Sequence, residues 1–258
     1  MSHLALMYRD LDQLKEGVAL QSLVLEKQRE LLGEAHPETL RSMSHLALMH
    51  KDLRQFKAAA ALQTFVLEKL KLQFGEDHAE SLQAMENLAL THGNLGQFKD
   101  AATLQTFVLE KRKEILGEED AHTLRIMSFL ALTHKDLGQL KSAETLQTFV
   151  LEKLRLLLGD KHADTLWTME NLALTYRDLG QFKDAAALQT FVLEKRQEIL
   201  GEEHAETLTA MSYLALTNRD LEQLDGIAVQ DQLMSPTRGQ GETSLMDTFI
   251  VYSTDEDR

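Results

Sequence analysis

The octapeptide LQTFVLEK occurs four times in this chain of 258 residues, and a fixed spacing separates its copies. The copies occupy residues 62–69, 104–111, 146–153 and 188–195, and a related string, LQSLVLEK, occupies residues 20–27. Each copy begins 42 residues after the previous one, without insertion or deletion. A constant period of this length is typical of stacked repeat architectures, in which each unit buries its apolar face against its neighbours. The sequence therefore predicts a repeat array that binds along a surface, rather than an enzyme with a catalytic pocket.

The charge and the cysteine content narrow the class of partner. The net charge of −14 at pH 7 argues against nucleic acid as a partner, because affinity for nucleic acid comes mainly from Lys and Arg that neutralise phosphates. The same charge disfavours anionic membrane surfaces. The chain has no cysteine, which fits a reducing compartment and excludes disulfides. No apolar run approaches the roughly 20 residues that span a bilayer. We therefore expect a cytoplasmic protein that binds neither nucleic acid nor membranes.

Residues 165–206 illustrate the content of one unit. The apolar residues of the first half recur at steps of three or four, which predicts a helix, and they are Leu166, Met169, Leu172, Ala173 and Tyr176. Gly180 follows and can end that helix in a left-handed conformation. A second helix is predicted from about Lys183 to Leu200, with an apolar stripe of Ala185, Leu188, Phe191, Val192 and Ile199. Each unit is therefore expected to be an antiparallel pair of helices.

Short acidic loops connect the units. In the example, Gly201 ends the second helix, and residues 202–206 form a loop whose acidic side chains suit the positive end of the next helix dipole. One position of this loop recurs as histidine or aspartate, both of which can accept a hydrogen bond from a helix N-terminus. This predicts an N-cap role for His36, His78, Asp120, His162 and His204.

Two segments of the unit resemble a known repeat family. Residues 171–178 read Asn-Leu-Ala-Leu-Thr-Tyr-Arg-Asp, and residues 180–185 read Gly-Gln-Phe-Lys-Asp-Ala. With the Leu-Gly and acidic-His loop that follow, they resemble the tetratricopeptide repeat of the 42-residue, kinesin-light-chain-like type. The resemblance implies an all-α, right-handed superhelical solenoid of antiparallel helix pairs. It covers residues 1–224, as six first helices and five complete second helices, with Ala173 and Ala185 at the helix crossings.

Residues 225–258 depart from the repeat. The sixth second helix should start near Gly226, and we expect a diverged closing helix there that stops at Ser235-Pro236. An acidic tail follows, with an apolar, β-prone segment at residues 245–252. Two interpretations stay open for this tail: it makes no fixed contact, or it docks on the array or on a partner.

No combination of residues in the sequence indicates a catalytic site, a metal site or a cofactor site. The loop histidines should lie about 10 Å apart, from the usual distance between packed helices, so that one metal ion cannot be reached by two of them. The recurring glycines end helices rather than forming a phosphate loop, and the carboxylates repeat with the unit. Catalysis requires one asymmetric set of convergent groups, which a near-identical array does not supply. We expect no catalytic residue, no metal site and no cofactor.

The positions that vary between units indicate where a partner binds. In tetratricopeptide arrays the first helix of each pair lines the concave groove, so the resemblance implies that variable residues of these helices face a protein or peptide partner. Aromatic, Arg and Asn side chains among them suit a peptide-binding surface, although ordinary surface variation is the alternative. The predicted partner-binding residues are Arg41, His45, Glu86, Asn87, Arg125, Phe129, Trp167, Glu170, Asn171 and Tyr213.

A longer period of 84 residues is superimposed on the first. Met-Ser and Met-Glu alternate in successive first helices, and in the second helices a pair of leucines alternates with Arg and Glu. The leucines either fill a gap in the stack or form an apolar patch for self-association, and they are Leu70, Leu72, Leu154 and Leu156.

The sequence leaves two functions open. The first is a non-enzymatic scaffold that binds a peptide or protein segment on its concave surface, and the resemblance makes the sensor array of a larger signalling protein one form of it. The second is a structural self-assembly module, in which homo-oligomers form through open repeat ends or through the apolar patches.

Overall fold

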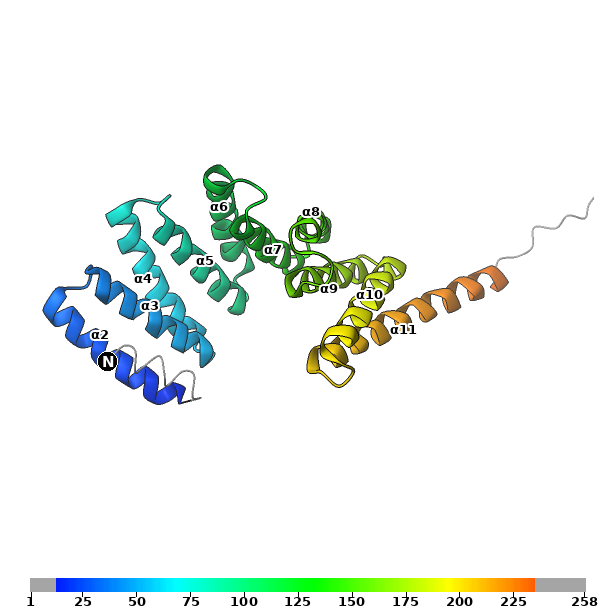
Figure 1. Cartoon of the computed structure of the whole chain (residues 1–258), viewed down its shortest axis with the longest axis horizontal. Helices are drawn as coiled ribbons and strands as arrows, with labels where there is room; N and C mark the ends of the chain where they lie inside the picture. The colour runs from blue at the N-terminus through cyan, green and yellow to red at the C-terminus, as the bar shows by residue number, and fades with distance from the viewer. Residues whose placement is uncertain (1–12, 235–258) are drawn as a thin grey trace, which may run out of the picture.

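The structure is a computed structural model that describes residues 13–234, and it describes side chains from residue 13 to residue 224. Within this part of the chain, every regular element is a helix, and each helix packs mainly against the next one along the chain (Figure 1). The second helices of the units are α2 (Leu14–Leu32), α4 (Phe56–Phe74), α6 (Phe98–Leu116), α8 (Leu140–Leu158) and α10 (Phe182–Leu200). The first helices are α3 (Pro37–Asp52), α5 (Ala79–Asn94), α7 (Ala121–Asp136), α9 (Ala163–Asp178) and α11 (Ala205–Met234). The predicted solenoid of helix pairs is therefore confirmed.

Small residues let the two helices of a pair approach closely. Ala173 of α9 and Ala185 of α10 are fully buried, as their equivalents are in the other internal units. Around them, apolar side chains from three successive helices meet, as Leu151, Met169 and Val192 do in one cluster. Because these clusters recur along the chain, the core is a column between units rather than a centre, as expected for a solenoid.

The caps predicted in the acidic loops are present. The Nδ1 atoms of His36, His78, His162 and His204 accept a hydrogen bond from the backbone N–H two residues further on, at 3.2–3.3 Å. Asp120 does the same with its carboxylate, at 2.9 Å. Each loop therefore satisfies one of the free N–H groups at the start of a first helix.

The turn inside a unit depends on a left-handed residue. Gly96, Gly138 and Gly180 adopt φ angles between 73° and 75° directly after the first helix. Arg54 takes the same place in the α3–α4 unit and has a φ of 58°, although a side chain disfavours this conformation. The chain thus reverses at this position in all four internal units.

The last unit differs from the prediction. Instead of ending before Gly226 and giving way to a closing helix, α11 continues without a break from Ala205 to Met234 and extends away from α10 (Figure 1). Glu222 stands where Gly180 reverses the chain in the preceding unit. Unlike glycine, glutamate disfavours a left-handed backbone conformation, and it therefore fits a helix that continues. Residues 245–252 of the tail lie outside the described residues.

One residue of the predicted apolar stripe was also misplaced. Ile199 lies in the last turn of α10 and is exposed, as is Leu200 next to it. The last turn of the other second helices is also exposed, as at Leu31, Leu116 and Leu157. Helical periodicity alone could not indicate how far the neighbouring helices cover this turn.

Candidate partner-binding surface

The first helices present most of the predicted partner-binding residues to solvent. Arg41, Asn87, Arg125 and Trp167 are exposed, and Trp167 is the only tryptophan of the chain. The half-buried members of the set are His45, Phe129, Glu170, Asn171 and Tyr213. Glu86 is the exception, because only 5% of it is exposed.

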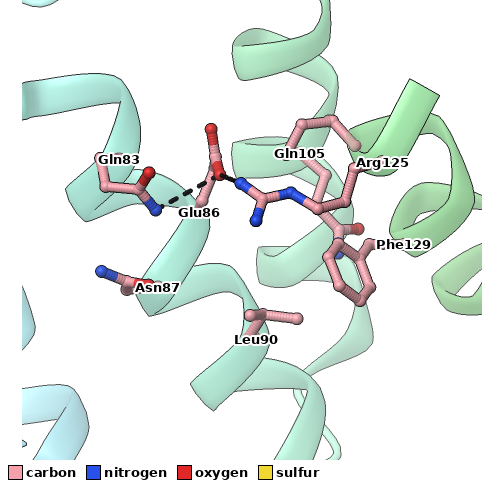
Figure 2. Close-up of a pocket in the computed structure, with 8 residues that line it drawn as sticks. Gln83, Glu86, Asn87, Leu90, Gln105, Arg125 and Phe129 are labelled. Atoms are coloured by element: carbon pink, nitrogen blue, oxygen red, sulfur yellow. Dashed lines mark hydrogen bonds and ion pairs between the residues drawn. The ribbon is translucent and has the colours of Figure 1, made fainter. Parts of the chain in front are cut away.

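The prediction that Glu86 faces a partner is wrong, because two arginines bind its carboxylate inside the stack. One of its oxygens accepts a hydrogen bond from Arg112 of α6 at 2.9 Å, and the other accepts one from Arg125 of α7 at 3.0 Å. Figure 2 shows Arg125 reaching across from α7, with Gln83 on the other side of the carboxylate. The buried charge therefore joins three helices, and its role in this structure is to connect them.

Glu170 occupies the equivalent place two units further on. It accepts a hydrogen bond from Arg196 of α10 at 2.8 Å, and Arg196 also donates to the backbone oxygen of Glu206. Burial raises the pKa of the Glu170 carboxyl, and the positive charge of Arg196 opposes that rise. Arg196 itself is buried, so this ion pair also belongs to the interior of the stack.

The two alternations with a period of 84 residues are one coupled exchange. Within each helix pair, the variable residue of the first helix meets the variable residue of the second helix 26 positions later. The combinations are Ser44 with Leu70, Glu86 with Arg112, Ser128 with Leu154, and Glu170 with Arg196. The sequence contains this signal, because both alternations have the same phase, but only the packing shows that the two positions lie against each other.

In the Ser–Leu units, this exchange leaves a pocket. Between α7, α8 and α9 lies a pocket of about 300 Å³. Ser128 and Leu154 lie in its wall, and three of the predicted residues line it together, namely Arg125, Phe129 and Trp167. The remaining lining is largely apolar, with Leu124, Leu157 and Leu158. We call it the α7–α9 pocket.

An equivalent pocket lies 84 residues earlier in the chain. It is formed by α3, α4 and α5, has a volume of about 280 Å³, and includes Ser44 and Leu70 in its lining. Its other walls are more polar, since Gln73 and Gln83 stand where the α7–α9 pocket has Leu157 and Trp167. We call it the α3–α5 pocket. In the intervening α5–α6 pair, Glu86 and Arg112 extend into the corresponding space.

A smaller pocket of about 100 Å³ lies between α5, α6 and α7 and is shown in Figure 2. Asn87, Leu90, Gln105 and Phe129 are among the residues that line it. The Oε1 atom of Gln105 is buried and has no hydrogen-bond partner among the described residues. The equivalent amides of Gln21, Gln63, Gln147 and Gln189 also have a buried atom without a partner, so this feature belongs to the interior of every unit rather than to the pocket.

The four leucines proposed for self-association separate into two groups. Leu70 is buried in the core, and Leu154 packs against the core. The prediction that these two leucines belong to an exposed patch is therefore wrong. They face inward because Ser44 and Ser128 leave room for them. Leu72 and Leu156 lie on the opposite side of the same helices and are 81% and 75% exposed.

The described residues contain no group of three or more His, Cys, Asp and Glu side chains that could hold a metal ion. In the same part of the chain, no helix is both long and apolar enough to cross a membrane.

Fold and surface together define a class of protein, the helical-repeat solenoids that act as scaffolds for protein–protein interaction. Sequence profiles of the tetratricopeptide repeat match residues 1–71 and 122–190, and a second such profile matches residues 81–122. The chain belongs to the tetratricopeptide repeat family. No curated protein sequence matches it.

Among solved structures, the chain is similar to a putative kinesin light chain from Podospora anserina with nearly identical TPR-like repeats. The identity is 25%, the TM-score is 0.69, and the match covers 77% of this chain and 94% of that one. BtubC (BKLC) from P. vanneervenii is 19% identical, with a TM-score of 0.67 over 93% of this chain and 99% of that one. RapI, in its apo form, is 15% identical, with a TM-score of 0.64 over 90% of each chain. The last two comparisons show the fold alone, and the family resemblance to kinesin-light-chain-like repeats is confirmed.

Proposed function

We propose that this chain is a non-enzymatic scaffold that binds a peptide segment of a partner protein across the concave surface formed by its first helices. The observation that carries this proposal is the α7–α9 pocket, where Arg125, Phe129 and Trp167 line one cavity. Variation between the repeats predicted these three residues independently of the pocket. Aromatic and Arg side chains in a partly apolar cavity are typical anchors at interfaces.

The spacing of the two larger pockets suggests the form of the ligand. Successive first helices of a solenoid lie about 10 Å apart, so pockets two units apart are separated by about 20 Å. An extended peptide rises by about 3.3 Å per residue and covers that distance in about six residues. We infer a ligand with a large apolar side chain in the α7–α9 pocket and a second, more polar side chain in the α3–α5 pocket.

The groups between the two pockets suit a peptide backbone. Gln83 and Asn87 are exposed, and both line the small pocket and the α3–α5 pocket. Their side-chain amides can donate hydrogen bonds to a peptide backbone and accept hydrogen bonds from it. The polar residues therefore support an extended ligand between the two anchors.

A displayed library of random peptides tests this proposal. Peptides selected on the full chain should share an apolar or aromatic residue, and Trp167→Ala should weaken their binding at least tenfold, the order of magnitude of losing one anchor side chain. Thr209→Ala is the matched control, because Thr209 occupies the equivalent position of α11, outside the pocket. Selected peptides that bind the Trp167→Ala chain as tightly as the unaltered chain would contradict the proposal.

A second candidate function is self-association through Leu72 and Leu156, which are exposed and 84 residues apart. Light scattering over a concentration series distinguishes it. A dimer that is lost in the Leu72→Asp/Leu156→Asp chain supports self-association, whereas a monomer at all concentrations excludes it.

We also infer two broader features. A sensor array within a larger signalling protein is compatible with the ligand-binding surface, and the lack of cysteine supports a cytoplasmic location.

A further inference from the structure

The last helix of the array exposes a face that every internal unit buries. Leu208 of α11 is 49% exposed, whereas its equivalent Leu166 in α9 is 4% exposed. Met211 is 42% exposed, and its equivalent Met169 is completely buried. The same two positions are almost completely buried in α3, α5 and α7. We call the surface formed by Leu208 and Met211 the terminal face.

Among the residues that the structure describes, no second helix covers this face. In the α9–α10 unit, Leu166 and Met169 lie in a cluster with Val192 of α10. In the last unit, α11 continues through the turn position at Glu222, so the residues beyond it extend along its axis to Met234. They do not return along Leu208 and Met211.

The opposite side of α11 packs against α10 and is tied to α9 by an ion pair. Thr207, Ala210 and Thr217 lie on the side that faces α10 and are buried. Arg177 of α9 and Asp220 of α11 form an ion pair at 2.8 Å. The terminal face is therefore held in the orientation that the corresponding faces have in the internal units.

A charged residue at the edge of this face is also left without its usual partner. In each internal unit, the second residue after the glycine that ends the preceding helix contacts the second helix of its own pair. Asp77 pairs with Lys111 at 3.4 Å, and Glu119 pairs with Lys153 at 2.7 Å. Ala35 accepts a hydrogen bond from Gln73, and Lys161 pairs with Glu198. Glu203 holds this position before α11 and has no ion-pair partner among the described residues.

We propose that the terminal face and Glu203 form a docking site for an amphipathic helix of a partner protein, which takes the place of the missing second helix. The interfaces inside the array specify its chemistry. In α6 the residues that meet the first helix include Ala101 and Val108, both fully buried, followed by the loop-binding Lys111. The partner helix therefore carries a small residue, an apolar residue seven positions later, and a basic residue three positions after that. The basic residue complements Glu203, and the helix extends an interface that the chain already uses four times.

A peptide from this chain provides the probe. A fluorescently labelled peptide with the sequence of residues 98–116, which is α6, is titrated into the full chain and followed by anisotropy. Saturable binding is expected, and Leu208→Asp should weaken it at least tenfold. Leu72→Asp is the matched control, because Leu72 is a strongly exposed leucine far from the terminal face. No saturable binding, or equal losses in the two variants, would overturn the proposal.

Charge reversal keeps the test independent of folding. Glu203→Lys in the chain should weaken binding of the unaltered peptide, and the Lys111→Glu peptide should recover part of the loss. Since Glu203 is an exposed loop residue, this variant is expected to fold normally. Charge reversal without effect on either peptide would contradict a helix in this register.

Two other occupants are outcomes that would overturn the proposal of a partner helix. If Phe249→Asp/Ile250→Asp raises the affinity for the peptide, the chain's own tail covers the terminal face. If the chain forms a dimer that Leu208→Asp abolishes, a second copy covers it. Unchanged peptide affinity in the first variant and a monomeric unaltered chain support the partner helix.

Discussion

At the scale of single residues, two solutions fill the same space within a helix pair. Ser44 with Leu70 and Ser128 with Leu154 combine a small polar group with an apolar one, and the alternate units combine Glu with Arg. A buried ion pair loses the hydration of both charges, and replacing it by apolar groups is often neutral or stabilising, whereas removing one partner is strongly destabilising. The chain itself shows that either pair fits, provided that both positions change together.

Exchange of the pair tests this coupling. Glu86→Ser alone should destabilise the chain by about 3 kcal/mol, because Arg112 and Arg125 are left without their common acceptor. Glu86→Ser/Arg112→Leu recreates the combination of the neighbouring units and should recover most of that loss. Urea denaturation followed by circular dichroism measures both. A double variant no more stable than the single variant would show that the two positions are independent.

At the scale of elements, the turn after each first helix decides whether a pair forms. Arg54 and Glu222 both stand where three units have glycine, yet the chain reverses at Arg54 and continues as a helix through Glu222. The difference lies in the next segment of the chain, since residues 56–74 supply a full second helix to bury and the residues after Leu224 do not repeat its sequence. The backbone preference of the turn residue alone could not predict where the chain reverses, because burial of the second helix offsets the backbone strain at Arg54.

The strain at Arg54 can be relieved. A left-handed conformation costs a side-chain-bearing residue about 1–2 kcal/mol, and glycine loses about 0.5–1 kcal/mol in unfolded-chain entropy. Arg54→Gly should therefore stabilise the chain by about 0.5–1 kcal/mol. The reverse change, Gly96→Arg, is the control and should destabilise by a similar amount. The urea midpoint measures both, and a destabilising Arg54→Gly would contradict backbone strain at this turn.

The attachment of α11 to α9 should depend on pH. The hydrogen bond from Arg177 lowers the pKa of the Asp220 carboxyl in the folded chain. Because the folded pKa is below that of the unfolded chain, the pair contributes stability above about pH 4, the ordinary range of Asp, and this contribution is lost as the pH falls through the lowered pKa. The protection factors of the α11 amides, which are corrected for the intrinsic pH dependence of hydrogen exchange, should therefore fall on acidification, and the fall should be smaller in Asp220→Asn. Equal falls in the two chains would assign the effect to other groups.

At the scale of the whole molecule, two periods coexist: the helix pairs repeat every 42 residues, and the side chains that fill them repeat every 84 residues. The 42-residue period predicted the helix pairs, the caps and the buried alanines, because each follows from residues near one another in sequence. The sequence did not predict which surface residues lie together in one site. Glu86 was assigned to the surface because its variability resembled that of Trp167, and only the packing of α6 and α7 shows that two arginines bury it. The pocket itself depends on the end of α8 lying beside α7 and α9, which no repeat period specifies.

The fluorescence of Trp167 reports peptide binding in the α7–α9 pocket without any substitution, because it is the only tryptophan and it lines this pocket. A selected peptide with an apolar anchor is titrated into the full chain while its own anisotropy reports binding. We expect the Trp167 emission to shift to shorter wavelength as the pocket fills, with the same midpoint as the anisotropy change. Peptides that bind fully while the Trp167 emission stays unchanged would contradict the proposed function, since the ligand would then lie elsewhere on the array.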